Sequence, residues 1–186
     1  MENVILLGIK HCGKSTQGRL LAEKFGSIFF DTDDILTQMT GKTPRELYTE
    51  KGREAFLDAE AQACRVLASK SETFVAATGG GFCTNSRAVD FLRGVGKFIF
   101  LNVDEKIACD RIIKEVEISS EGTLKNLPSY IARENPATFD DVRRSFHKFF
   151  EERTKIYREL CNLEVKMLPV SKGENLKRIL TALKSA

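Results

Sequence analysis

The sequence has no tryptophan, 4 prolines and 5 cysteines, and the odd number of cysteines argues against a disulfide framework. The cysteines form no C-x-x-C pair, and the 2 histidines lack the spacing of a zinc site. There is no long apolar run, and no basic leader or cleavage site precedes the first apolar stretch. We therefore expect a protein of the reducing cytoplasm without a membrane partner. The formal net charge of +3 is too small to indicate nucleic acid as a partner.

The chain has 186 residues, 42% of them hydrophobic, which suits a single domain spanning residues 1–186. Short apolar runs alternate with helical periodicity, which predicts an α/β protein with a parallel sheet and helices on both faces. We predict strands at 2–7, 27–30, 73–77, 97–103 and 163–168. We predict helices at 14–25, 32–39, 43–50, 52–69, 86–92, directly after Asp104, at 142–160 and at 174–184. Residues 115–141 are polar, contain a glycine and two prolines, and give no clear prediction.

A glycine-rich turn follows the first strand and matches the pattern G-x-x-x-x-G-K-[ST]. Glycines let successive N–H groups point inward at phosphate oxygens, and the helix that follows adds its positive N-terminal end. The lysine would reach the β- and γ-phosphates, and the serine hydroxyl would ligate Mg²⁺. We therefore expect nucleotide binding by Gly8, His11, Cys12, Gly13, Lys14, Ser15 and Thr16. The side chains of His11 and Cys12 are expected to point out of the loop, since no partner residue is visible.

Carboxylates follow the second predicted strand in the stretch FFDTDD, from Phe29 to Asp34. Ligands of open α/β sheets bind past the carboxyl ends of the strands. Asp31 and Asp33 alternate in an extended segment, so one could hold waters on Mg²⁺ while the other accepts a proton from an acceptor hydroxyl. Asp34 fits better the acidic start of a helix.

The third predicted strand ends in ATGGG, and Gly79, Gly80 and Gly81 would leave bare N–H groups and room for a ligand. The phosphate loop alone leaves GTPases, motor ATPases and small-molecule kinases open. No N-K-x-D-like guanine signature is present, which weakens the GTPase interpretation.

Taken together, these motifs resemble the shikimate kinase family, within the nucleoside-monophosphate-kinase-like group of P-loop proteins. The resemblance rests on the glycine turn, on FFDTDD, on GKTPRELYTEKGREAFLDAE from Gly41 to Glu60, on ATGGG, and on EERTKIY from Glu151 to Tyr157. It implies a three-layer α/β/α fold with a five-stranded parallel sheet and a lid within about residues 112–140. It also implies ATP and Mg²⁺ as cofactors and phosphorylation of shikimate to shikimate 3-phosphate, a step of aromatic amino-acid biosynthesis.

The same resemblance implies roles for individual residues. Asp33 would bind the acceptor hydroxyls and act as base, Asp31 would lie by the waters of Mg²⁺, and Arg111 would lie near the phosphates. Lys14, Asp33 and Arg111 are thus the expected catalytic residues, and Ser15 and Asp31 the expected metal ligands. Gly79, Gly80 and Gly81 would line the acceptor site, and Arg153 would bind its carboxylate.

The chain departs from the family in the acceptor-binding stretch and in the lid. Leu57 stands where the family has an arginine that binds the acceptor carboxylate, and Arg53 stands where it has glutamate. Since Arg53 lies one helical turn from Leu57, we hypothesise that it restores the lost contact, although a solvated arginine is the alternative. The lid has NLPSY from Asn126 to Tyr130, with no arginine before the proline.

These departures leave the acceptor open between shikimate and another sugar acid or polyol. A weakly active nucleotide-binding regulator is the alternative of a different class. We expect a monomer that acts on a small hydroxylated acid.

Overall fold

The central layer of the molecule is a five-stranded parallel sheet, seen in a computed structural model that describes residues 2–185. The strand order is β2-β3-β1-β4-β7. The strands are β1 (Asn3–Leu7), β2 (Ile28–Asp31), β3 (Phe74–Ala77), β4 (Gly96–Val103) and β7 (Leu163–Met167). All four pairings are parallel, so the carboxyl ends of β1, β2 and β3 lie together at one edge. The expected sheet and its five strands are confirmed.

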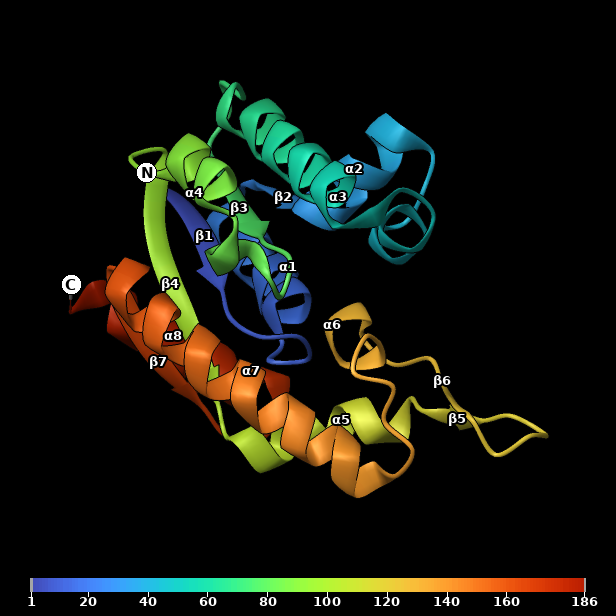
Figure 1. Ribbon diagram of the computed structural model, residues 1–186. Helices are drawn as coiled ribbons and strands as arrows, with labels where there is room; N and C mark the ends of the chain where they lie inside the picture. Colours follow the sequence, from blue (N-terminus) through green and yellow to red (C-terminus); the bar gives the residue numbers. More distant parts are fainter. Residues whose placement is uncertain (1, 186) are drawn as a thin grey trace.

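Helices cover both sides of this sheet, as Figure 1 shows. The helix α1 (Lys14–Phe25) packs against β3, β2 and α8 (Lys172–Lys184), whereas α7 (Phe139–Leu160) packs against β4 and the short helix η1 (Phe82–Thr84). The remaining helices are α2 (Thr32–Thr40), α3 (Pro44–Ala68), α4 (Ser86–Leu92), α5 (Glu105–Lys114) and α6 (Ser129–Ala132). In the described part of the chain, no helix is both long enough and apolar enough to cross a membrane.

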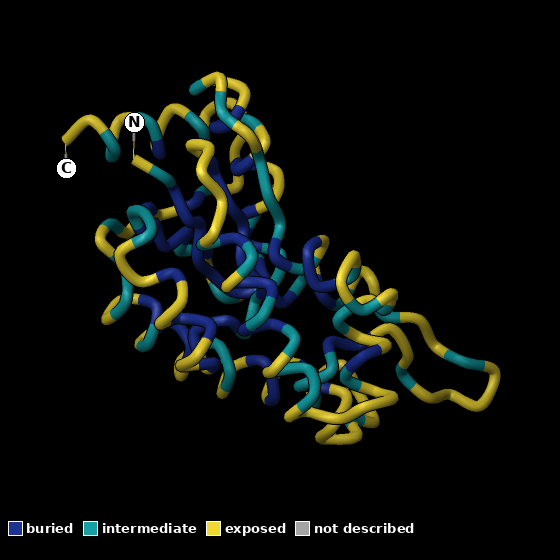
Figure 2. Tube along the Cα trace, turned by 90° about the horizontal axis from the view of Figure 1, so that it is seen from above, coloured by how far each residue is buried: buried dark blue, intermediate teal, exposed yellow. Residues whose placement is uncertain are grey.

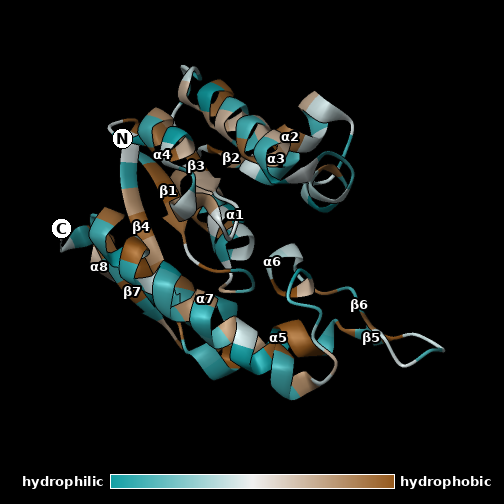
Figure 3. Cartoon of the chain, viewed as in Figure 1, coloured by the Kyte–Doolittle hydropathy of each residue, from teal (hydrophilic) through white to brown (hydrophobic). Residues whose placement is uncertain are grey.

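The core follows from the apolar runs of the strands. Residues 4–7 of β1 and 74–77 of β3 are buried, and the hydropathy colouring of β1 and β4 in Figure 3 shows the same apolar character. Figure 2 shows this buried centre in dark blue, with exposed residues around it. A strand covered on both faces must be apolar along its whole length, which explains the unbroken runs in the sequence.

The helix α3 contains a kink at Gly52, and its two parts correspond to the two helices predicted at 43–50 and 52–69. Gly52 has φ 82° and ψ −180° inside the helix, a backbone conformation that suits glycine. The helix begins with a capping box in which Thr43 and Glu46 bond reciprocally. The kink separates Arg45, near the start of α3, from Leu57 and Glu60 in its second half.

The segment without a clear sequence prediction forms a two-stranded hairpin and a short helix. The hairpin strands are β5 (Glu117–Ile118) and β6 (Leu124–Lys125), and they pair antiparallel. Figure 1 shows this hairpin, in yellow, projecting away from the body of the molecule. The long helix α7 begins at Phe139, three residues before its expected start, because Thr138 and Asp141 form another capping box.

Candidate active site

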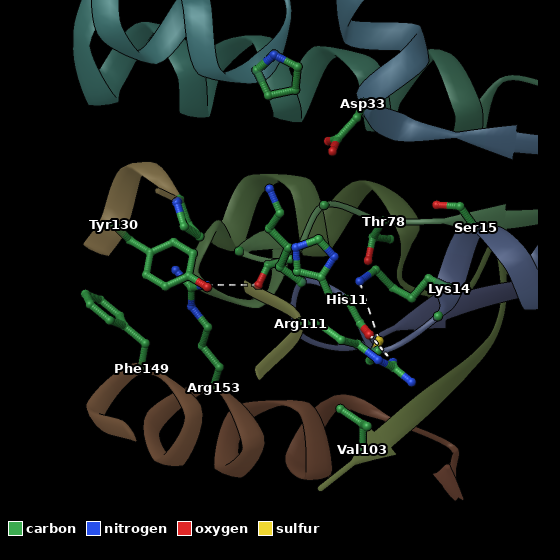
Figure 4. A pocket seen from close by; sticks show the side chains of 18 of the residues that line it. His11, Lys14, Ser15, Asp33, Thr78, Val103, Arg111, Tyr130, Phe149 and Arg153 are labelled. Carbon is green, nitrogen blue, oxygen red and sulfur yellow. Dashed lines mark hydrogen bonds between the residues drawn. The ribbon is translucent and has the colours of Figure 1, made fainter. Parts of the chain in front are cut away.

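A cavity of about 1070 Å³ lies at the carboxyl edge of the sheet. It is lined by the glycine turn, the ends of β2 and β3, the helix α3, the segment 128–133 and α7. Figure 4 shows the side chains that meet there, among them Lys14, Asp33, Arg111 and Arg153. The structure therefore brings together residues that are more than 100 positions apart in the sequence.

The glycine turn is folded around the ammonium group of Lys14. Lys14 Nζ donates to the carbonyl oxygens of Gly8 at 2.8 Å and Ile9 at 2.9 Å, and the residue is 8% exposed. Gly8 has φ 144°, and a Cβ there would lie 2.6 Å from Cys12 Sγ, so the turn needs glycine at this position. The loop thus holds a buried cation at the N-terminus of α1, which is the arrangement that favours phosphate.

The expectation that Cys12 points out of the loop is wrong. Cys12 is 1% exposed, and its Sγ lies 3.6 Å from Lys14 Nζ, because the side chain fills the space beneath the turn. His11 has φ 63°, and its Nε2 lies 3.2 Å from Glu115 Oε2. Burial lowers the pKa of His11. His11 therefore links the loop to the residue that follows α5.

Two oxygen groups suited to Mg²⁺ lie beside the loop. Ser15 Oγ donates to Asp31 Oδ2 at 2.7 Å, and Asp31 Oδ1 accepts from the backbone N–H of Asp33 at 3.1 Å. The second contact makes Asp31 the N-cap of α2. Asp34 lies in the acidic first turn of that helix, as expected, whereas Asp33 lies in the same turn and not in the expected extended segment. Mg²⁺ in nucleotide sites uses one or two protein oxygens together with phosphate oxygens and water, so this pair fits the ion.

Asp33 and Glu60 are two carboxylic acids at the wall formed by Gly79. A Cβ on Gly79 would lie 3.1 Å from Asp33 Oδ1 and 3.0 Å from Glu60 Oε1. Burial, with a smaller contribution from Asp31, raises the pKa of Asp33 to about 6. Burial likewise raises the pKa of Glu60 to about 7. An Asp33 of this kind is ionised near neutral pH and basic enough to accept a proton.

Glu60 is held in place by Asn85, the N-cap residue of α4. Asn85 Nδ2 donates to Glu60 Oε2 at 2.9 Å and to the carbonyl of Leu57 at 2.8 Å. Glu60 is 2% exposed, and its Oε1 has no hydrogen-bond partner among residues 2–185. A buried acceptor without a partner is costly, so this oxygen is well placed to meet a ligand group.

Arg153 lies between two aromatic rings, next to the wall of the cavity that is formed by Gly79, Gly80 and Gly81 (the glycine wall). Its guanidinium carbon is 4.2 Å from the ring centre of Tyr130 and 5.3 Å from that of Phe149, and Nη1 donates to the carbonyl of Gly80 at 3.1 Å. The residue is 7% exposed, and its Nε has no partner among residues 2–185. Such a fixed, partly unsatisfied guanidinium suits a planar anion such as a carboxylate.

The glycine wall differs in one detail from the expectation of bare N–H groups. The N–H of Gly79 donates to Thr32 Oγ1 at 3.1 Å and is therefore occupied. Gly80 has to be glycine, because a Cβ there would lie 2.7 Å from the backbone nitrogen of Lys10. The close contact places the loop and the end of β3 directly side by side.

The two other arginines expected at the site lie at its rim. Arg111 Nη1 donates to the carbonyl of His11 at 2.6 Å, so Arg111 stands over the phosphate loop. Arg53 lines the cavity, and its Nη1 lies 3.2 Å from Glu54 Oε1, with 52% of its side chain exposed. Arg53 is thus more solvated than Arg153. Its role at the acceptor stays a prediction.

Several residues of the cavity were missed by the sequence analysis, because it followed motifs rather than surfaces. Glu60 ends the stretch FLDAE, in which the sequence pattern offered a reason to consider only Leu57, three residues before it. Tyr130 ends the stretch NLPSY but received no role there, and Phe149 comes from a segment without a recognisable motif. Lys10 occupies a variable position of the turn, although a cation inside a phosphate loop is a signal in itself.

Comparisons with known proteins agree with this geometry. The family model of shikimate kinase matches residues 10–184. The shikimate kinase of Clostridium beijerinckii is 33% identical over 162 residues, which cover 87% of this chain and 83% of that protein. The crystal structure of shikimate kinase from Aquifex aeolicus has a TM-score of 0.73 at 26% identity, covering 98% of this chain and 96% of that chain. The shikimate kinase from Acinetobacter baumannii in complex with shikimate has a TM-score of 0.83 at 24% identity, covering 100% and 94%, a likeness of fold.

Proposed function

We propose that this chain, which belongs to the shikimate kinase family, transfers the γ-phosphoryl group of ATP to a ring hydroxyl of shikimate, giving ADP and shikimate 3-phosphate. The observation that supports this most directly is the cavity itself. It joins the phosphate loop around Lys14 to an acceptor wall with a basic carboxylate, Asp33, and a buried cation, Arg153.

The proposed reaction is an in-line displacement. The acceptor hydroxyl oxygen forms a bond to the γ-phosphorus, while the bond from that phosphorus to the β–γ bridging oxygen breaks and leaves its electron pair on ADP. Asp33 accepts the hydroxyl proton, for which its raised pKa is suited. Lys14 and Arg111 stabilise the negative charge of the phosphates, since both lie at the loop.

Mg²⁺ would be held by Ser15 and Asp31, whose side-chain oxygens already meet at 2.7 Å. When bound, the ion neutralises charge on the phosphate oxygens. The protein's own part is to hold Asp31 in place through the N–H of Asp33. The metal and the acid–base residue are therefore positioned by the same turn at the start of α2.

The acceptor would lie against the wall formed by Gly79, Gly80 and Gly81. Arg153 binds its carboxylate, and Leu57 contributes an apolar surface where the family has arginine. The loss of that arginine removes one charge-assisted hydrogen bond, which is worth about 1.5–3 kcal/mol. We therefore expect a higher KM for shikimate than in relatives with both arginines.

A coupled assay of ADP release tests this function. The purified protein with ATP and Mg²⁺ is offered shikimate and, in parallel, other hydroxylated acids and neutral polyols. We expect the fastest ADP release with shikimate, and a mass increase of one phosphoryl group in the product. Asp33→Asn serves as the inactive control. Equal ADP release with and without every acceptor would contradict the proposal, and a faster sugar acid or polyol would replace shikimate as the acceptor.

The monomeric state, the cytoplasmic location and the lack of a nucleic-acid or membrane partner stay predictions. Native mass spectrometry of the purified chain would test the first of them.

A further inference from the structure

We propose that Lys10 is a second phosphoryl-binding cation of this enzyme, which contacts the γ-phosphoryl oxygens from the acceptor side during transfer. This inference rests on the proposed function. It gives a catalytic role to a side chain at one of the four variable positions of the G-x-x-x-x-G-K-[ST] pattern.

The first support is the position of Lys10 between the two halves of the site. Lys10 belongs to the phosphate loop and lines the cavity. Its backbone packs on the acceptor wall, since a Cβ on Gly80 would lie 2.7 Å from Lys10 N and 3.2 Å from Lys10 Cα. The side chain therefore starts where the nucleotide half and the acceptor half of the cavity meet.

The second support is that Lys10 has no partner, whereas most cations of the cavity do. Among residues 2–185, no ion pair and no hydrogen bond is formed by the Lys10 ammonium group. Other cations of the lining are held by carbonyl oxygens, namely Lys14, Arg45, Arg111 and Arg153. Arg53 is held by a carboxylate, and the remaining cations, Lys114, Arg133 and Lys172, are exposed. Lys10 is thus the partly buried cation that stays available for an anion.

The third support is the set of charges around Lys10. Burial and the charge of Arg45 lower the pKa of Lys10, Lys14 lowers it further, and Asp33 and Glu115 raise it. Lys10 is therefore electrostatically close both to Lys14, which binds the donor phosphates, and to Asp33, which accepts the hydroxyl proton. The transferring group has to pass between these two residues.

The chemistry of transfer needs a cation at this place. Negative charge spreads over three equatorial oxygens of the γ-phosphoryl group, and fixed cations in a dry cavity stabilise it. In the lid, Leu127 stands directly before Pro128, so the lid supplies no cation from that position. Lys10 supplies that charge from the loop below. It forms no covalent bond and transfers no proton, since the proton goes to Asp33.

Steady-state kinetics of Lys10→Met test the inference. Methionine keeps most of the length of the side chain and removes the charge. We expect kcat to fall roughly 10²-fold, as for the loss of one preorganised donor to a developing charge. The KM values for ATP and shikimate should change by less than about threefold. Lys10→Arg should keep at least a tenth of the wild-type kcat, because it retains a cation.

The matched control is Lys24→Met, which removes the same charge from an exposed position near the end of α1. It should leave kcat unchanged. Thermal unfolding should give Lys10→Met a Tm no lower than that of the wild type, because a partly buried ammonium without a partner contributes little to stability. A second readout is calorimetric binding of ADP with aluminium fluoride and shikimate. Lys10→Met should weaken it about as much as kcat falls, while binding of a non-hydrolysable ATP analogue stays the same.

Two outcomes would overturn the inference. If Lys10→Met raises the KM for shikimate and leaves kcat unchanged, Lys10 binds the acceptor carboxylate instead. If neither parameter changes, Lys10 takes no part in the reaction. The wild-type rate with shikimate in the same experiment tests the proposed function, whereas the ratio of variant to wild type tests Lys10, so the two failures are distinguishable.

Discussion

Lowering the pH should inactivate this enzyme through Asp33 well before ordinary carboxylates titrate. Asp33 faces Asp31 at the end of β2, Asp34 on α2, Lys10 and Lys14 of the phosphate loop, and Glu60 on α3. Burial is the largest influence, and it raises the pKa of Asp33 from 3.8 to about 6. Under the proposed mechanism only the ionised form of Asp33 accepts the hydroxyl proton, so we expect activity to require a pH above this value.

The size of the effect follows from the pKa. With a pKa of about 6, only about one tenth of the molecules have an ionised Asp33 at pH 5, whereas an ordinary aspartate would be more than about nine tenths ionised. We expect kcat/KM for shikimate to fall about tenfold between pH 8 and pH 5, with a slope of one on the acidic side. Lys10→Met should move this fall to higher pH, since the charge of Lys10 lowers the pKa of Asp33.

The assay is the initial rate of ADP release at limiting shikimate, between pH 4.5 and 9, with far-UV circular dichroism at each pH to confirm that the chain stays folded. Asp33→Asn should be inactive throughout. A wild-type rate that stays constant down to pH 5 would refute both the raised pKa and the assignment of Asp33 as base.

Further predictions concern the phosphates, the acceptor carboxylate and stability. Lys14→Ala should abolish turnover while circular dichroism shows an intact fold; retained turnover in a folded variant would contradict the assignment of the loop. Arg153→Ala should raise the KM for shikimate at least tenfold. Arg53→Ala tests whether Arg53 also binds the acceptor carboxylate, and an unchanged KM for shikimate would show that it does not. Glu60→Gln should stabilise the fold at pH 8 by up to about 3 kcal/mol in urea unfolding, since the pKa of Glu60 is raised from 4.5 to about 7. Because the pKa is raised in the folded state, the wild type loses stability as the pH rises from 4.5 to about 7. The stability gained by Glu60→Gln should therefore vanish below pH 4.5, and an equal gain below pH 4.5 and at pH 8 would refute the raised pKa of Glu60.

The sheet and the phosphate loop could be predicted because they depend on local patterns. A buried parallel strand needs an unbroken apolar run, and a phosphate loop needs glycines and a lysine at fixed spacing. The break at Gly52 agrees with the two helices predicted at 43–50 and 52–69. The hairpin of β5 and β6 follows no such rule, because short exposed strands have little apolar patterning.

The side-chain contacts of the site depend on tertiary structure and could not be predicted in the same way. Cys12 looks like an exposed loop residue until the turn closes over it. Glu60 owes its raised pKa to burial, whereas the hydrogen bond from Asn85, which lies 25 residues away in the chain, lowers it. The aromatic rings around Arg153 come from α6 and α7, and only the folded chain places them together.

The guanidinium group of Arg45 holds the segment after β6 by its backbone. Arg45 Nη2 donates to the carbonyls of Asn126 at 3.2 Å and Leu127 at 3.0 Å, and Asn126 Nδ2 donates to the carbonyl of Glu115 at 2.7 Å. This segment continues into Tyr130 at the cavity wall. An activated phosphoryl group reacts with water wherever water can reach it. We expect a wall tied to α3 in this way to limit the entry of water, so that ATP is spent on the acceptor rather than on hydrolysis.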